Sequence, residues 1–240
     1  MQRLSRVSRL FGSVRDSLHH VLPPRCVFCG AAGAPEGICP GCTGDLPGRD
    51  AMRCPVCAVP MPMPEVCGEC LRKPPAFDHV VSAVSYAFPV DAAIQRLKYG
   101  LDLALVPPLA ALLARAVSAG PRPDLLLPMP LGPARLRERG FNQAAELARY
   151  VAVALGLPLS LEASRRTRET APQTSLPFDE RARNIRNAFA AGPSVAGLHV
   201  AVVDDVLTTG ATLDALAKAL RRAGAREVTG WVLARTPRGQ

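Results

Sequence analysis

The stretch VAVVDDVLTTGAT, from Val200 to Thr212, constrains the fold more than any other part of this sequence. Apolar residues that favour β-structure lead into two adjacent acids, a short Thr/Gly turn and then a run with helical spacing, a pattern that predicts strand, loop and helix. Ligands of open parallel sheets bind beyond the carboxyl ends of the strands, so we expect Asp204 and Asp205 at a binding crevice. The following loop, Val206–Thr212, offers backbone N–H groups, hydroxyls and a helix N-terminus, which suit a phosphate.

The chemistry of this stretch fits a ribose 5-phosphate, whose vicinal hydroxyls need paired acceptors and whose phosphate needs nearby donors. An aspartate pair that only caps a helix is the simpler alternative, but a cap needs one acid and no Thr-Thr-Gly turn. VVDDVLTTGAT also resembles the phosphoribosyl pyrophosphate (PRPP) signature of the type I phosphoribosyltransferases. That resemblance makes Asp204 and Asp205 the candidate catalytic pair. It also implies a 5-phosphate site made of Val206, Leu207, Thr208, Thr209, Gly210, Ala211 and Thr212.

The eight cysteines form a second strong pattern, because all of them lie in Cys-x-x-Cys pairs. The pairs are Cys26/Cys29, Cys39/Cys42, Cys54/Cys57 and Cys67/Cys70. A shift of 28 residues superimposes the first two pairs on the last two, so the segment is an internal duplication. Two such pairs supply the four thiolates of a tetrahedral zinc site, and each unit therefore predicts one structural zinc ribbon.

Other uses of these cysteines are less favoured by the sequence. Disulfides would need an oxidising compartment, and no export signal precedes the cysteines. Four cysteines can also hold an iron–sulfur cluster. The spacing leaves open whether each ion takes consecutive pairs, which we favour, or whether the pairs interleave. A closed four-cysteine site leaves no position for water, so we expect the zinc to be structural and not catalytic.

Composition bounds the remaining possibilities for this chain of 240 residues. No apolar run approaches the ~18 residues of a membrane helix, so we expect a cytoplasmic protein without membrane insertion. Residues 1–22 have the apolar spacing of an amphipathic helix, with arginines on its other face. The net charge of +9 would suit a nucleic-acid partner, but 26 of the 29 basic residues are Arg, as a GC-rich coding bias would also produce.

After Pro75 the sequence contains no cysteine and alternates between strand and helix patterns, as α/β domains do. We expect strands at 79–88, 124–127, 159–163, 197–204 and 227–234, helices at 91–99, 103–119 and 211–223 and another ending at Leu155, and a polar tail at 235–240. In phosphoribosyltransferases the turn after the first core strand is the pyrophosphate loop. The resemblance therefore implies pyrophosphate contacts from Met129, Pro130 and Leu131, with Arg135 and Arg139 as candidate charge partners. A solvated helix face is the alternative for these two arginines.

Two further segments are candidates for ligand contact. Lys98 lies at the polar centre of Leu-Lys-Tyr-Gly, although an exposed helix end would explain it equally well. Residues 165–186 are polar, interrupted by proline and contain six arginines. Long irregular segments in compact domains are often lids, and this one would close on a polyanion. The candidate lid residues are Arg166, Arg168, Gln173 and Arg181.

Taken together, the blocks LKYG, PMPLGPARLRERGFNQA, RTRETAPQTSLPFDERARNIRNAF and VVDDVLTTGAT behind a Cys-pair segment resemble the ComF family, also called amidophosphoribosyltransferase-like or GntX-like. The resemblance implies a small double zinc ribbon at 23–75 and an α/β domain of the type I phosphoribosyltransferase kind, a parallel sheet with flanking helices, at 76–240. It implies two structural Zn²⁺ ions and a site for PRPP with Mg²⁺.

Two functions follow from the resemblance. One is an enzyme that transfers phosphoribosyl from Mg-PRPP to an unknown acceptor and releases pyrophosphate through a transition state with oxocarbenium character. The alternative is a non-catalytic PRPP sensor or scaffold that works with single-stranded DNA or DNA-uptake proteins, as the family's link to competence and natural transformation implies. Aromatic residues make up only 5% of the chain, so a platform for stacked bases is not evident.

Overall fold

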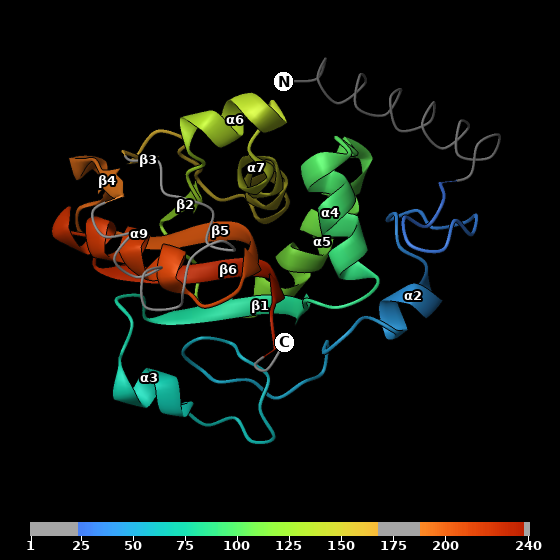
Figure 1. Ribbon diagram of the computed structural model, residues 1–240, viewed down its shortest axis with the longest axis horizontal. Helices are drawn as coiled ribbons and strands as arrows, with labels where there is room; N and C mark the ends of the chain where they lie inside the picture. Colours follow the sequence, from blue (N-terminus) through green and yellow to red (C-terminus); the bar gives the residue numbers. More distant parts are fainter. Residues whose placement is uncertain (1–23, 168–187, 238–240) are drawn as a thin grey trace, which may run out of the picture. The chain divides into compact units, whose positions relative to one another are not determined.

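A four-stranded parallel sheet lies within the larger of two compact units, Leu46–Gln240 (Figure 1), in a computed structural model, which describes residues 24–167 and 188–237. Its strands are β1 (His79–Ser85), β2 (Leu125–Pro128), β5 (His199–Leu207) and β6 (Glu227–Arg235), in the order β1-β6-β5-β2. All neighbouring strands run parallel. Parallel strands are covered on both faces and read as continuous apolar runs, which explains the fully buried Val200–Val203. The predicted α/β fold class is confirmed.

Helices flank this sheet as right-handed crossovers require. The helices that pack on the strands are α5 (Val106–Val117), α7 (Gln143–Leu155) and α9 (Ala211–Arg222). The connection through α9 leads from β5 to β6, whereas the connection through α5 leads from β1 to β2 in the opposite direction across the sheet. Right-handed crossovers that run in opposite directions place their helices on opposite faces. The helices and strands expected for the sheet and its flanking layers are present, and their ends differ from the expected ones by a few residues.

Smaller elements complete the described chain. They are the helices α2 (Pro40–Gly44), α3 (Gly68–Arg72), α4 (Val90–Tyr99) and α6 (Pro133–Arg139), the strands β3 (Ser164–Arg166) and β4 (Phe189–Ala191), and 3₁₀ turns at Leu103–Leu105 and Pro193–Val195. None of the helices within the described ranges is both long and apolar enough to cross a membrane. The amphipathic helix expected at 1–22 lies outside the described residues.

One expected strand, 159–163, is wrong. Leu159 makes only an isolated parallel bridge to Leu126 at the edge of β2. The hydroxyl of Ser160 then accepts the backbone N–H of Ala163 at 3.1 Å, which turns the chain instead of extending it. Serine side chains compete with strand pairing in this way, and an apolar pattern alone does not reveal it. The next strand, β3, begins at Ser164 and pairs with β4, outside the main sheet.

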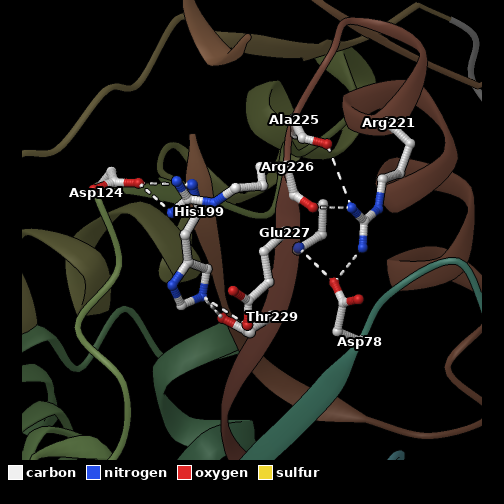
Figure 2. A network of polar contacts seen from close by, with 9 residues as sticks. Asp78, Asp124, His199, Arg221, Ala225, Arg226, Glu227 and Thr229 are labelled. Atoms are coloured by element: carbon white, nitrogen blue, oxygen red, sulfur yellow. Dashed lines mark hydrogen bonds and ion pairs between the residues drawn. The ribbon is translucent and has the colours of Figure 1, made fainter. Parts of the chain in front are cut away.

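The amino ends of the strands are held by acids that precede two of them (Figure 2). Asp78, just before β1, accepts a hydrogen bond from the N–H of Val228 at 2.8 Å. It also forms an ion pair with Arg221 at the end of α9. Asp124, just before β2, accepts the N–H of His199 at 2.8 Å and pairs with Arg226 at 3.2 Å. Each acid therefore ties the start of its strand to a neighbouring strand and fixes the register between them.

Replacing Asp78 with alanine should destabilise the protein by about 1–2 kcal/mol, because the N–H of Val228 and the guanidinium of Arg221 lose their shared acceptor. The measurement is the free energy of unfolding in urea. Asp102→Ala is the matched control, since Asp102 pairs with Arg96, whose side chain is 57% exposed, and its loss should cost less than about 0.5 kcal/mol. Equal losses in the two variants would contradict this role of Asp78.

Candidate functional site

The predicted acid pair lies at the carboxyl end of β5, but the strand runs further than expected. Val206 and Leu207 pair with Ala234 and Arg235 of β6, so they belong to the strand and not to the loop. The connecting loop is therefore only Thr208–Gly210, with both threonines exposed. The sequence did not reveal this because β6 itself continues one residue past its expected end, to Arg235.

Gly210 gives this loop its shape. It precedes the first turn of α9 with φ of 82°, a left-handed conformation that side chains other than glycine rarely adopt. The hydroxyl of Thr209 accepts the N–H of Ala211 at 3.3 Å. The first N–H groups of α9 consequently open onto the same edge of the sheet as the acids of β5, which is the arrangement that binds phosphate groups.

Asp204 and Asp205 differ in their surroundings, because neighbouring residues of a strand point to opposite faces. Asp205 is 7% exposed and pairs with Lys98 of α4, whose Nζ lies 3.0 Å from Oδ2. Asp204 is half-buried and accepts the N–H of Asp205 at 2.9 Å. Burial, and then the charge of Asp205, raise the pKa of Asp204 to about 7, although Lys98 lowers it. Lys98, predicted as a possible ligand contact, thus lies at the acid pair.

The predicted pyrophosphate loop follows β2 at the same edge of the sheet. The N–H of Met129 donates to Val203 of β5 at 2.8 Å, and its carbonyl accepts from Asn142 at 3.0 Å. The side chain of Met129 is also buried. Met129 therefore fixes the loop to the sheet, whereas Pro130 and Leu131 are partly exposed beside it.

Of the two arginines predicted beside this loop, Arg139 is fixed by neighbours. Its guanidinium lies 5.2 Å from the ring centroid of Tyr99 on α4 and donates to Oε1 of Gln143 at 3.2 Å. Arg135, also on α6, is half-buried. Gln143 was not predicted from the sequence, yet it is 2% exposed at the first turn of α7. Its Nε2 and the Nε of Arg139 are buried without a hydrogen-bond partner, so two donors remain beside the loop.

The described part of the predicted lid is its stem. β3 and β4 pair antiparallel, with Arg166 opposite Phe189, so the described residues that flank 168–187 lie side by side. The guanidinium of Arg166 lies 5.4 Å from the Phe189 ring centroid. Its side chain also passes Gly132, where an added Cβ would lie 3.4 Å from Cδ of Arg166. Arg166 is therefore close to the pyrophosphate loop, while the predicted residues Arg168, Gln173 and Arg181 lie outside the described residues.

The eight cysteines gather into two groups of consecutive pairs, Cys26–Cys42 and Cys54–Cys70. Within each group the four sulfurs lie within 4.8 Å of one another, and the cysteines are free thiols. Tetrahedral Zn–S bonds of about 2.3 Å place sulfurs about 3.8 Å apart. The Cys29–Cys39 and Cys57–Cys67 sulfurs lie 3.8 and 3.7 Å apart, so both groups fit zinc. The sequential pairing, which the sequence favoured over an interleaved one, is the one observed.

The backbone repeats at the same interval as the cysteines. Arg25 bridges Ala32 and donates to the carbonyl of Gly30, and 28 residues later Arg53 bridges Pro60 and donates to the carbonyl of Ala58. Helices α2 and α3 begin 28 residues apart as well. The predicted duplication is therefore confirmed in the geometry of the two ribbons.

Comparison with known proteins agrees with this architecture. A double zinc ribbon domain matches residues 17–71, and a phosphoribosyl transferase domain matches residues 133–240. DNA utilization protein YhgH of Salmonella typhi is 38% identical over 207 residues, which cover 83% of this chain and 91% of that protein. Competence protein F of Haemophilus influenzae is 33% identical over 223 residues, 88% of this chain and 96% of that protein.

Among solved structures, this chain is similar to the glutamine phosphoribosylpyrophosphate amidotransferase from B. subtilis complexed with ADP and GMP. The match covers 57% of this chain and 30% of the amidotransferase chain. Its sequence identity of 21% and TM-score of 0.39 are too low to inform the site.

The raised pKa of Asp204 makes a prediction about stability. The folded-state pKa of about 7 exceeds the ordinary value of 3.8, so ionising Asp204 costs stability as pH rises between these values. Asp204→Asn should therefore melt a few degrees above the wild type at pH 8 and lose most of that advantage at pH 4.5. Differential scanning calorimetry at the two pH values tests this, and a melting difference that does not change with pH would contradict the raised pKa.

Proposed function

Since the chain belongs to the family of DNA utilization protein YhgH and competence protein F, we propose that it binds Mg-PRPP at the carboxyl edge of its sheet and transfers the phosphoribosyl group to an acceptor. One observation carries this proposal. Two adjacent acids lie close to the end of β5, with Asp205 two residues before its last residue, Leu207, and the three-residue loop after Leu207 leads directly into the N-terminus of α9. Acceptors for hydroxyls and donors for a phosphate are thereby placed a few residues apart.

The acids are proposed to hold the ribose. Asp204 and Asp205 offer carboxylate oxygens for its hydroxyls, and such hard oxygen ligands also suit Mg²⁺. The backbone N–H groups and hydroxyls between Thr208 and Thr212 are proposed to hold the 5-phosphate. Mg²⁺, when bound, would neutralise charge on the departing pyrophosphate. In the ligand-free protein, Lys98 compensates part of the negative charge of the acid pair.

The loop after β2 is proposed to hold the pyrophosphate. Pro130 has no N–H, so the backbone donors of this turn would be Leu131 and Gly132. The unpartnered donors of Arg139 and Gln143 lie on the adjoining helices, and Arg166 passes the same glycine. The proposal therefore assigns donors from the loop, the adjoining helices and β3 to the departing pyrophosphate, whose charge they would compensate.

In the transfer reaction, the bond between C1 of the ribose and the pyrophosphate oxygen breaks, and a bond from C1 to the acceptor forms. The protein supplies position and charge compensation, since no side chain at this edge needs to act as a nucleophile. A reducing, cytoplasmic setting would keep the ribbon cysteines as thiolates for zinc.

Asp204→Asn separates binding from folding, because it should stabilise the fold and yet weaken Mg-PRPP binding by at least about ten-fold, as expected when one acceptor of a charged ligand is lost. Isothermal titration calorimetry with Mg-PRPP measures the affinity, and Asp102→Asn is the control, because Asp102 pairs with Arg96 and not with Lys98. Wild-type protein that gives no heat at millimolar Mg-PRPP would overturn the proposed site. Release of pyrophosphate over a panel of amines and nitrogenous bases then separates an enzyme from a sensor.

A second candidate function comes from the names of the relatives, which refer to DNA utilization and to competence. In this alternative the chain keeps the PRPP site as a sensor or scaffold and works with single-stranded DNA during uptake. The net charge of +9 is compatible with a polyanionic partner.

Binding to a single-stranded oligonucleotide should then weaken steeply as salt rises, because the arginines release counterions when they neutralise phosphates. Fluorescence anisotropy between 50 and 200 mM NaCl measures the slope, and an increase of at least about ten-fold in Kd is expected. The same titration with Mg-PRPP present asks whether the two ligands are coupled. Absence of binding at 50 mM NaCl would remove the scaffold function.

A further inference from the structure

The two zinc ribbons have the same backbone but different surroundings. In the second group all four cysteines are buried, and they belong to one core cluster with residues of the sheet and α9. In the first group only Cys26 is buried, and Cys29 is exposed. The chain also divides into two compact units between Asp45 and Leu46, which leaves the second ribbon in the same unit as the sheet.

Arg235 connects the second ribbon to the loop after β5. It is the last residue of β6 and is only 5% exposed, although the sequence placed it in a polar tail. Its Nε donates to the carbonyl of the zinc-group residue Cys57 at 2.9 Å. Its Nη1 donates to the carbonyl of Leu207 at 3.0 Å and to the carbonyl of Thr208. One guanidinium thus bonds the ribbon and the loop at the same time.

The direction of these bonds matters for phosphate binding. In a planar trans peptide the N–H points opposite to the carbonyl. Because the carbonyls of Leu207 and Thr208 point toward Arg235, the N–H groups of Thr208 and Thr209 point away from its guanidinium. Arg235 therefore orients backbone donors of the loop that is proposed to hold the 5-phosphate.

A second contact comes from the segment between the second ribbon and β1. The N–H of Ala76 donates to Oδ1 of Asp214 in the first turn of α9 at 2.7 Å. The buried ring of Phe77 lies against Gly210, where an added Cβ would be 3.8 Å from the ring. The segment that joins the second ribbon to β1 thus contacts both Gly210 and the first turn of α9.

We propose that Arg235 is a positioning residue that joins the second zinc ribbon to the 5-phosphate loop, so that an intact second ribbon is required for phosphoryl binding and an intact first ribbon is not. This inference rests on the proposed PRPP site. It assigns different tasks to the two copies of the duplication: the second completes the site, and the first does not contribute to it.

The duplication supplies a matched test in the full-length chain. Cys26→Ser and Cys54→Ser change equivalent buried positions, 28 residues apart, in the first and second ribbon. Each should lose one of two bound zinc ions by elemental analysis. Cys54→Ser should weaken Mg-PRPP binding by at least about ten-fold in calorimetry, whereas Cys26→Ser should bind like the wild type.

A second pair of variants leaves the cysteines intact. Arg235→Lys keeps the positive charge but cannot reach the ribbon and two loop carbonyls together. It should retain two zinc ions, weaken Mg-PRPP binding about ten-fold and speed amide hydrogen exchange at residues 206–212. The control is Arg53→Lys, because Arg53 donates to Gly48 and Ala58 of the second ribbon and not to the loop. It should leave both measurements unchanged.

The exchange measurement separates this inference from the proposed function. If wild-type protein does not bind Mg-PRPP, the proposed function fails, but faster exchange at 206–212 in Arg235→Lys and Cys54→Ser alone would still support the coupling. Equal effects in Cys26→Ser and Cys54→Ser would overturn it. Unchanged exchange and affinity in Arg235→Lys would overturn it as well.

Discussion

The pairing of β5 with β6 is the constraint on which the rest of this structure depends. Its register runs without interruption from His199 opposite Glu227 to Leu207 opposite Arg235. A shift of one residue would turn every side chain to the other face. It would remove Asp205 from Lys98 and Arg235 from the loop, and it would move Gly230 from the position where any Cβ would collide with Leu213 of α9. The same register therefore fixes the acid pair, the loop and the helix behind it.

The sequence predicted those parts that local pattern determines. An apolar run followed by Asp204 and Asp205 was sufficient to predict β5, although not where its loop begins, and the spacing of the cysteines was sufficient for two metal groups. Arg235 was missed because an arginine after an apolar strand resembles an exposed end; its burial depends on carbonyls from Cys57, Leu207 and Thr208, which are distant in sequence. Gln143 was missed because a polar residue in the first turn of a helix resembles an exposed one, although it is buried. The roles of the site residues in binding PRPP stay predictions.

The two ribbons show how identical local structure can take different positions in a protein. Each repeat keeps its arginine-to-carbonyl bond, its cysteine turn and its short helix. Gly30, with φ of 75°, is replaced by Ala58 with φ of 56°, a conformation that costs a residue with a side chain about 1 kcal/mol. Ala58 is buried in the core of the second unit, where its methyl group gains contacts that offset this cost. Duplication supplied the fold, and packing then distinguished the copies.

The electrostatics of the acid pair favour ligand binding over stability. Two neighbouring carboxyls at a strand end, one of them with a pKa raised to about 7, are unfavourable in the ligand-free protein, and one lysine compensates only part of their charge. Such a cost persists in a fold only where the surrounding structure is stable enough to bear it, here through the buried valines of β5. A bound cation, together with hydroxyl groups that donate to the carboxylates, would relieve the repulsion between the acids. Under the proposed function, relief of this repulsion would contribute to the binding free energy of Mg-PRPP.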